Sequence, residues 1–195
     1  MTANERYGKN LETRRLIEGG VFFTLFCLTV PAANWLIQHV GTTCVPGGPC
    51  LIPIAPGLAA PSGVLMIGLA LVLRDLIQRR LGVALSAASI LVGAGISAAI
   101  APPALVIAST AAFAISEFAD LAVYTPLARR RLIAAVIASG MVGLVVDSVV
   151  FLWLAFGSLE YLPGQVAGKA LMIFVAVPFL VLLRRRDERL GLTPA

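Results

Sequence analysis

Fourteen of the fifteen lysines and arginines in this chain lie in four short clusters, and the residues between the clusters are almost all apolar. The clusters are Arg6 to Arg15, Arg74 to Arg80, Arg129 to Arg131 and Arg184 to Arg189. Because basic residues stay on the cytoplasmic side of a membrane, four clusters indicate three excursions across it and back. The sequence therefore predicts six membrane-spanning helices, with the N- and C-termini in the cytoplasm.

The composition supports this class of protein. Of the 195 residues 59% are hydrophobic and only 13% are charged, which excludes a water-soluble domain. We expect an all-α membrane protein in which residues 1–195 form a single transmembrane domain. The net charge of +5 is confined to turns and tails, so the lipid bilayer is the expected partner and nucleic acid is not.

The expected spans are residues 16–37, 62–79, 83–100, 104–127, 132–156 and 166–183. The second span is short because Pro53, Pro56 and Pro61 interrupt the apolar stretch before it. Residues 55–63 therefore either line a binding pocket, where irregular backbone is tolerated at membrane depth, or form a simple outer loop.

Residues 38–60 are expected outside the membrane, and they include Cys44 and Cys50 on either side of a Pro-Gly-Gly-Pro turn. Such a turn can bring two cysteines together, and the extracytoplasmic side permits oxidation. The pattern favours a Cys44–Cys50 disulfide. A metal site is disfavoured because no further cysteine or histidine lies nearby, and we expect no cofactor.

Charged side chains inside the spans are the informative exceptions, because each costs several kcal/mol in the bilayer. Glu117 and Asp120 lie three residues apart on one helix face, roughly 18 and 13 Å from the inner surface. Asp147 and Lys169 lie on consecutive helices at matched depths of roughly 22 to 24 Å, which predicts an ion pair. These four residues either contact a ligand or coupling ion, or fix the packing of the helices.

Two further polar residues have two interpretations each. Asp75 is a functional acid, or it forms an interfacial pair within its helix, where Arg79 lies one turn away and Arg74 lies beside it. Asn34, near the outer end of the first span, is a pocket donor or an interfacial residue.

Five short segments follow one another along the predicted spans. They are Ala33 to Leu36, Leu73 to Gly82, Ile115 to Leu121, Ser139 with Val146 to Ser148, and Gly168 to Ala170. Together they resemble the queuosine-precursor transporters, which are also described as vitamin uptake transporters. The resemblance implies a six-helix importer of 7-deazaguanine bases such as preQ0 and preQ1, in the cytoplasmic membrane of a prokaryote. It points to six substrate-binding residues, namely Asn34, Asp75, Glu117, Asp120, Asp147 and Lys169.

The chemistry of such a base suits these residue types. A guanine-like edge presents two adjacent N–H donors, which one carboxylate can accept, and a carbonyl that Lys169 or Asn34 can satisfy. We expect Glu117 and Asp120 to hold the guanine edge, with the pair of Asp147 and Lys169 beside it.

Three aromatic residues in or near the spans have two interpretations. Trp35, Phe118 and Trp153 either stack on the base or pack against lipid and protein.

Other functions remain open at this stage. The chain could be the substrate-capturing subunit of a larger ATP-driven uptake system, and it has no Gly-x-x-x-x-Gly-Lys-Ser/Thr loop of its own for ATP. An intramembrane enzyme is disfavoured because the sequence lacks a metal-ligand cluster and a nucleophile with its base. A purely structural bundle is the remaining alternative. The sequence does not fix the exact substrate, the energy coupling, or whether the chain is a monomer or a homodimer.

Overall fold

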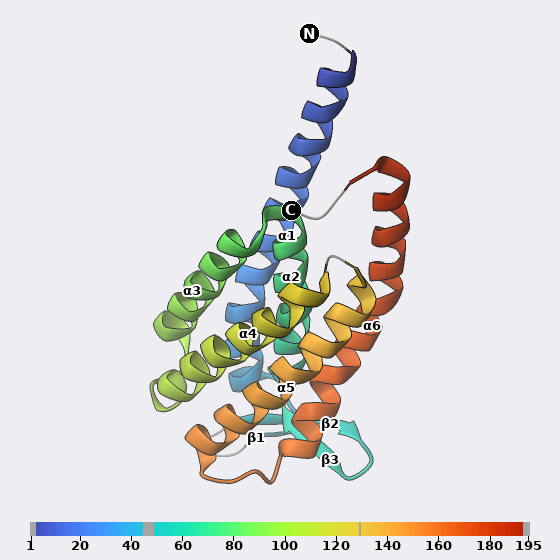
Figure 1. The fold of residues 1–195 in the computed structure, drawn as a ribbon. Helices are drawn as coiled ribbons and strands as arrows, with labels where there is room; N and C mark the ends of the chain where they lie inside the picture. Colours follow the sequence, from blue (N-terminus) through green and yellow to red (C-terminus); the bar gives the residue numbers. More distant parts are fainter. Residues whose placement is uncertain (1–2, 45–48, 129, 193–195) are drawn as a thin grey trace.

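The computed structural model describes residues 3–44, 49–128 and 130–192. Within them the chain forms six long helices, with a small sheet between the first and the second (Figure 1). The helices are α1 (Ala3–His39), α2 (Val64–Leu81), α3 (Val83–Ile100), α4 (Val106–Ala128), α5 (Leu132–Phe156) and α6 (Leu162–Leu190), and the short 3-10 helix η1 (Pro103–Leu105) precedes α4. Helices α3 and α5 begin and end at the residues expected for the third and fifth spans.

Five helical segments in the described part of the chain are long and apolar enough to cross a membrane. They are Lys9–His39, Val83–Ile100, Pro103–Ala128, Leu132–Phe156 and Leu162–Leu190. The chain is therefore a multi-pass helical membrane protein. The count of six spans and the cytoplasmic position of the termini stay predictions.

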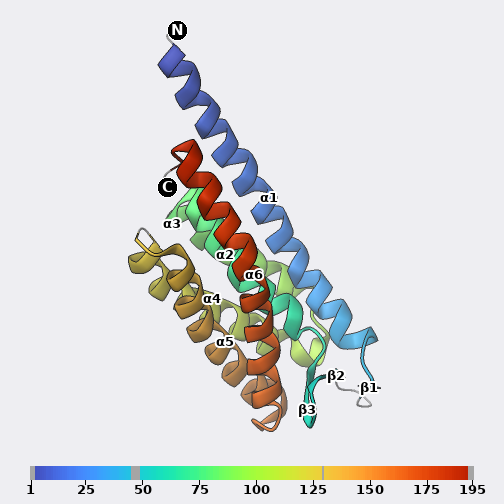
Figure 2. The same ribbon diagram turned by 90° about the vertical axis from the view of Figure 1, so that its right-hand side faces the viewer.

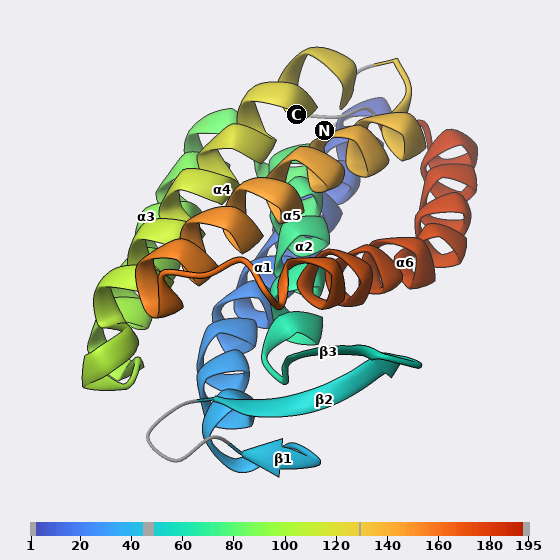
Figure 3. The same cartoon turned by 90° about the horizontal axis from the view of Figure 1, so that it is seen from below.

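Helix α2 is the expected span that is not among these five, and its sequence carries Arg74, Asp75, Arg79 and Arg80. It contacts each of the other five helices and lies among them when the bundle is viewed along its length (Figure 3). A helix with this charge can lie at membrane depth only where protein surrounds it and pairs its side chains. The five apolar helices provide that enclosure.

The start of α1 and the end of α6 lie towards one end of the bundle and the sheet lies at the other (Figures 1 and 2). The first turns of α1 project beyond the remaining helices at the terminal end (Figure 2). We call the two regions the terminal end and the sheet end. This arrangement is the one that an even number of crossings produces.

The sheet corrects the prediction of an all-α protein with a loop at residues 38–60. Strands β1 (Thr43–Cys44), β2 (Cys50–Ala55) and β3 (Leu58–Pro61) pair antiparallel in the order β1-β2-β3. The prolines suggested irregular backbone, but β1 pairs only with Cys50 and Leu51, so β2 has a single neighbour at Pro53. A proline is tolerated in a strand at such a free edge because no ladder hydrogen bond is lost.

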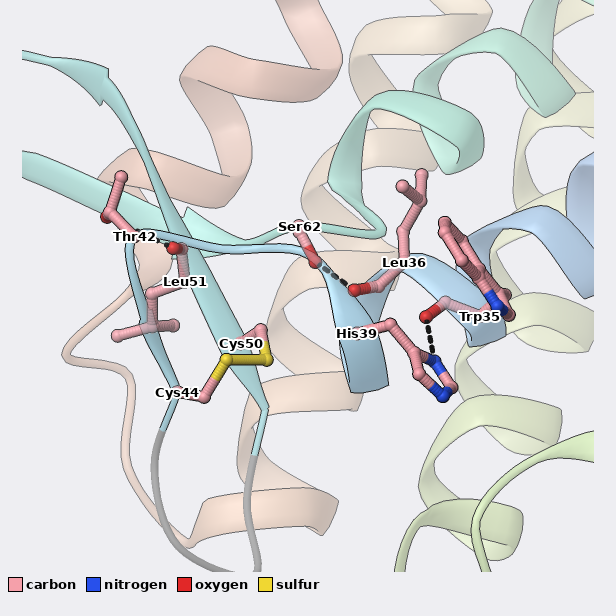
Figure 4. The surroundings of a disulfide bond; sticks show 8 residues. All are labelled: Trp35, Leu36, His39, Thr42, Cys44, Cys50, Leu51 and Ser62. Carbon is pink, nitrogen blue, oxygen red and sulfur yellow. Dashed lines mark hydrogen bonds between the residues drawn. A yellow bond between two sulfur atoms is a disulfide. The ribbon is translucent and has the colours of Figure 1, made fainter.

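The sheet is tied both to itself and to the helices (Figure 4). Cys44 and Cys50 are partners in the β1–β2 register and are joined by a disulfide, as the sequence favoured. Residues 45–48, which include most of the predicted turn, lie outside the described residues. The Ser62 hydroxyl donates a hydrogen bond of 2.7 Å to the Leu36 carbonyl, which fixes the start of α2 against the end of α1.

Two glycines allow the helices to pack closely around α2. A Cβ atom on Gly68 would lie 2.8 Å from the carbonyl oxygen and 2.9 Å from the Cα of Lys169, so α2 and α6 meet backbone to backbone there. A Cβ on Gly143 of α5 would lie 2.8 Å from Leu71 Cδ2 and 3.1 Å from Asp120 Oδ2. Small residues at such crossings are typical of membrane helix packing.

The close approach of α2 and α6 at Gly68 predicts that a larger residue there lowers the stability of the protein. Gly68→Ala should force α2 and α6 apart, cost about 1–3 kcal/mol and lower the melting temperature of the detergent-solubilised protein by roughly 2 to 10 °C. The matched control is Gly95→Ala in α3, where a Cβ would meet no neighbouring atom within 4 Å and alanine favours the helix. Equal melting temperatures for the two variants would contradict the close packing of α2 and α6.

Candidate functional site

A cavity of about 60 Å³ lies among the helices towards the sheet end. All six helices or their first turns contribute to its lining, and so does strand β3 through Pro61. The polar lining residues are Asn34, Ser97, Ser109, Asp147, Gln165 and Lys169, and the aromatic ones are Phe113 and Phe151. Pro61 and Gly63, from the segment 55–63, line this cavity. This supports the interpretation that the segment lines a pocket.

The predicted ion pair of Asp147 and Lys169 is present in this cavity. Lys169 Nζ lies 2.6 Å from Asp147 Oδ2, and the two side chains are only 1% and 8% exposed. The ammonium also donates to Ser148 Oγ at 2.8 Å and to Gln165 Oε1. Three acceptors satisfy all three N–H donors of a lysine, which offsets its removal from water.

The second carboxylate oxygen of Asp147 is held less firmly. Asp147 Oδ1 accepts from the Ser116 hydroxyl at 3.5 Å, which is long for a hydrogen bond. It therefore remains able to accept a shorter hydrogen bond from a ligand in the cavity. Asn34 faces the same cavity from α1, where its amide nitrogen donates to the Val30 carbonyl at 3.0 Å.

A second buried set of charges lies outside the lining of this cavity, and we call it the Arg74 cluster (Arg74, Asp75, Glu117 and Asp120). Arg74 Nε lies 3.2 Å from Glu117 Oε2, and Arg74 Nη2 binds both Asp120 Oδ1 and, at 2.8 Å, Asp75 Oδ1. All four side chains are at most 1% exposed. Glu117 and Asp120 thus share a helix face as predicted, but they point at an arginine of α2.

The second basic cluster, which the sequence placed on the cytoplasmic side, consists of side chains that are buried in the protein. Arg74 is fully buried. Asp75 does not pair with Arg79; it contacts Arg74 and accepts a 3.1 Å hydrogen bond from Ser139. The available signal was the charged Arg74–Asp75 dipeptide well inside an apolar helix.

Arg79 and Arg80 are also engaged within the protein, at the terminal end. Asp187 of α6 accepts from Arg79 at 2.9 and 3.0 Å and from Arg80 at 2.7 and 2.9 Å. Glu18 of α1 accepts from Arg80 at 2.8 Å and from Arg186 at 2.6 Å. These ion pairs join α1, α2 and α6 and close the terminal end. Arg129, from the third basic cluster, lies outside the described residues.

The aromatic residues considered for stacking face outwards. Trp35, Phe118 and Trp153 are 56%, 41% and 62% exposed, which suits contact with lipid, and Trp35 stacks on His39. The rings that do line the cavity are Phe113 and Phe151. Sequence reasoning missed these two because an apolar ring in an apolar helix carries no distinguishing signal.

Apolar helices of membrane-spanning length around a cavity with a few buried polar groups are the arrangement in which membrane transporters bind small ligands. Residues 99–183 match the family model described as putative vitamin uptake transporter. The match confirms the resemblance over these residues, which include Glu117, Asp120, Asp147 and Lys169. The similar segments around Asn34 and Arg74 lie outside it. No curated protein and no solved structure matches the chain.

The burial of the Asp147–Lys169 pair predicts a non-additive stability effect. Lys169→Met would leave the Asp147 carboxylate without its cation and should cost about 3–5 kcal/mol of folding stability. Adding Asp147→Asn to the same chain should recover most of that loss, as measured by thermal unfolding in detergent. The exposed pair of Arg184 and Glu188 provides the control, because Arg184→Gln should leave the melting temperature unchanged. A double variant less stable than Lys169→Met alone would show that the two side chains are not coupled.

Proposed function

We propose that this chain imports a 7-deazaguanine base, such as preQ0 or preQ1, across the cytoplasmic membrane of a prokaryote. The observation that carries the proposal is the buried Asp147–Lys169 pair in a cavity between the helices. Both residues lie in the part of the chain that matches the vitamin uptake transporter family.

The pair has the chemistry that a guanine-like edge requires. One carboxylate can accept the two adjacent N–H groups of the base, and the neighbouring ammonium can donate to its carbonyl oxygen. The two charges cancel, so the pair can bind an uncharged base such as preQ0 without leaving a net charge buried. Phe113 and Phe151 provide apolar faces in the same cavity, against which a planar ring can stack.

The cargo contacts are therefore assigned differently from the sequence-based expectation. Asn34, Asp147, Gln165 and Lys169 line the cavity and are proposed to contact the base. The three acids of the Arg74 cluster are not among the lining residues and already bind a guanidinium, so we do not assign the guanine edge to them.

The size of the cavity bears on the transport cycle. Pockets that hold drug-sized ligands usually measure about 300 Å³ or more, whereas this one measures about 60 Å³. A bicyclic base would need the helices to move apart. In an alternating-access cycle this structure corresponds to a closed state, with the terminal end held by the ion pairs of Asp187 and Glu18.

The first test is uptake by the purified protein in liposomes. The chain alone should take up labelled preQ0, and Lys169→Ala and Asp147→Asn should each reduce uptake at least tenfold, because a hydrogen bond to a charged group contributes about 1.5–3 kcal/mol. Glu160→Gln is the control, since Glu160 is exposed and lies outside the cavity.

The outcomes separate the alternatives. Normal uptake by both cavity variants would refute the assignment of the site. Uptake that appears only when ATP-hydrolysing partner subunits are added would instead support the substrate-capturing subunit of a larger system.

The second test identifies the ligand by thermal stabilisation. A ligand that binds only the folded protein at 100 times its dissociation constant should add about 2.7 kcal/mol of stability and raise the melting temperature by roughly 5 to 10 °C. We expect preQ0 or preQ1 to give this shift, and Lys169→Ala to remove it. A panel of guanine, adenine and water-soluble vitamins provides the comparison, and a larger shift with one of those compounds would replace the proposed cargo.

A further inference from the structure

The Arg74 cluster has no role in the proposed binding of the base, yet it holds four buried charged side chains in mutual contact. It combines three carboxyl groups with a single guanidinium, and each of the four side chains is at most 1% exposed. If all three acids were ionised, the cluster would carry three negative charges and one positive charge, which is a net charge of −2. A net charge of that size away from water is strongly disfavoured, and the smallest group that can remove it is a proton.

The hydrogen bonds of the cluster point to the same conclusion. Among the residues that the structure describes, Asp120 Oδ2 and the Tyr124 hydroxyl are buried without a hydrogen-bond partner. Tyr124 is fully buried, and its ring lies 5.6 Å from the Arg74 guanidinium carbon, so its hydroxyl belongs to this environment. Because ionised carboxylates only accept, a proton is what lets one of these acids act as a donor. A cluster with unused acceptors is therefore prepared to bind protons.

The polar groups around the cluster come from three helices. They are Arg74, Asp75, Gln78 and Arg79 of α2, Glu117, Asp120, Tyr124 and Thr125 of α4, and Ser139 and Asp147 of α5. The charges on the other helices are paired elsewhere, since Lys169 of α6 binds Asp147 and Glu18 of α1 binds Arg80 and Arg186, and α3 has no charged residue. Among the described residues, Arg74 is thus the cation that binds the three acids directly.

The cluster is connected to the cargo cavity through α4 and α5. Glu117 follows Ser116, whose hydroxyl lies 3.5 Å from Asp147 Oδ1 in the cavity. One turn before Asp147, Gly143 brings the α5 backbone against Asp120. A change of charge at Glu117 or Asp120 therefore alters the surroundings of Asp147, which is proposed to hold the base.

We propose that the Arg74 cluster binds the proton that drives uptake, with Glu117 and Asp120 as the carboxyl groups that gain and lose it. This inference rests on the proposed function, because it needs a cargo whose transport the proton drives. Protonation of the carboxylate forms an O–H bond on the side of high proton concentration, and the same proton leaves on the cytoplasmic side. The burial of the cluster suits this role, because at one stage of the transport cycle a proton-coupling site must be inaccessible from both sides of the membrane.

A metal ion fits the cluster less well. Arg74 contacts all three acids and so competes with any cation for them. Among the described residues no group of three or more acids, histidines or cysteines is arranged to hold a metal ion.

The test uses the full-length protein in liposomes with the membrane potential clamped at zero. We expect wild-type protein to exchange labelled for unlabelled preQ0 at equal pH, and to accumulate this neutral base up to about tenfold per unit of pH gradient if one proton accompanies each base. Addition of preQ0 should acidify the lumen, as reported by a trapped pH-sensitive dye. Glu117→Gln and Asp120→Asn should lose accumulation and lumenal acidification while exchange continues, and Glu160→Gln should behave as wild type.

The possible results are distinct. Wild-type exchange of preQ0 without accumulation or acidification would overturn the proton site and leave the import of the base standing. Absence of wild-type exchange would overturn the import of this cargo and the present inference with it. Accumulation and acidification that persist in both Glu117→Gln and Asp120→Asn would show that the proton is bound elsewhere. If either variant fails to fold, a wild-type protein that exchanges preQ0 without acidifying the lumen still overturns the proton site, and the variant that does fold tests its location.

Discussion

The arrangement of the whole protein depends on the need to enclose the charges of α2. A charged side chain in the bilayer interior must find its partner inside the protein. Arg74 finds Glu117 and Asp120 on α4, and Arg79 and Arg80 find Asp187 on α6. These partners draw helices that are distant in sequence onto α2. The apolar helices then face lipid, and the single helix that could not do so occupies the centre.

The same physics explains what the sequence could and could not predict. The bounds of α3 and α5 could be predicted because each lies between a turn signal or basic residues and consists of apolar and small residues, apart from Asp147 in α5. The pair of Asp147 and Lys169 could be predicted because consecutive antiparallel helices bring equal depths together. That argument uses only the rise per residue and needs no knowledge of how non-consecutive helices pack.

The ion pairs of Arg74 with Glu117 and Asp120 on α4 could not be predicted from depth alone. Helices α2 and α4 are not consecutive, so their contact depends on the packing of the whole bundle. The rule that basic clusters mark the cytoplasmic side describes loops, so it does not predict whether a single arginine within a helix, such as Arg74, is buried. The sheet was missed for a different reason. The prolines predict only an interruption of a helix, whereas Pro56 and Gly57 form the two-residue turn of a local hairpin that pairs β2 with β3.

The two ends of the bundle are held by bonds of different kinds, and this difference bears on which end can open. At the sheet end, the disulfide of Cys44 and Cys50 closes β1 onto β2, and α6 packs so tightly on β3 that a Cβ on Gly164 would lie 2.0 Å from the Ala59 carbonyl oxygen. At the terminal end, α1, α2 and α6 are joined by ion pairs between arginines and two acids. Ion pairs can exchange partners or water at little net cost when they reach solvent, whereas a disulfide cannot.

If α6 moves during transport, the sheet end is the natural pivot and the contacts of Asp187 and Glu18 are the ones that must separate. Lys169 lies between these two regions on α6, so a tilt of this helix about the sheet would change the geometry of its pair with Asp147 on every cycle.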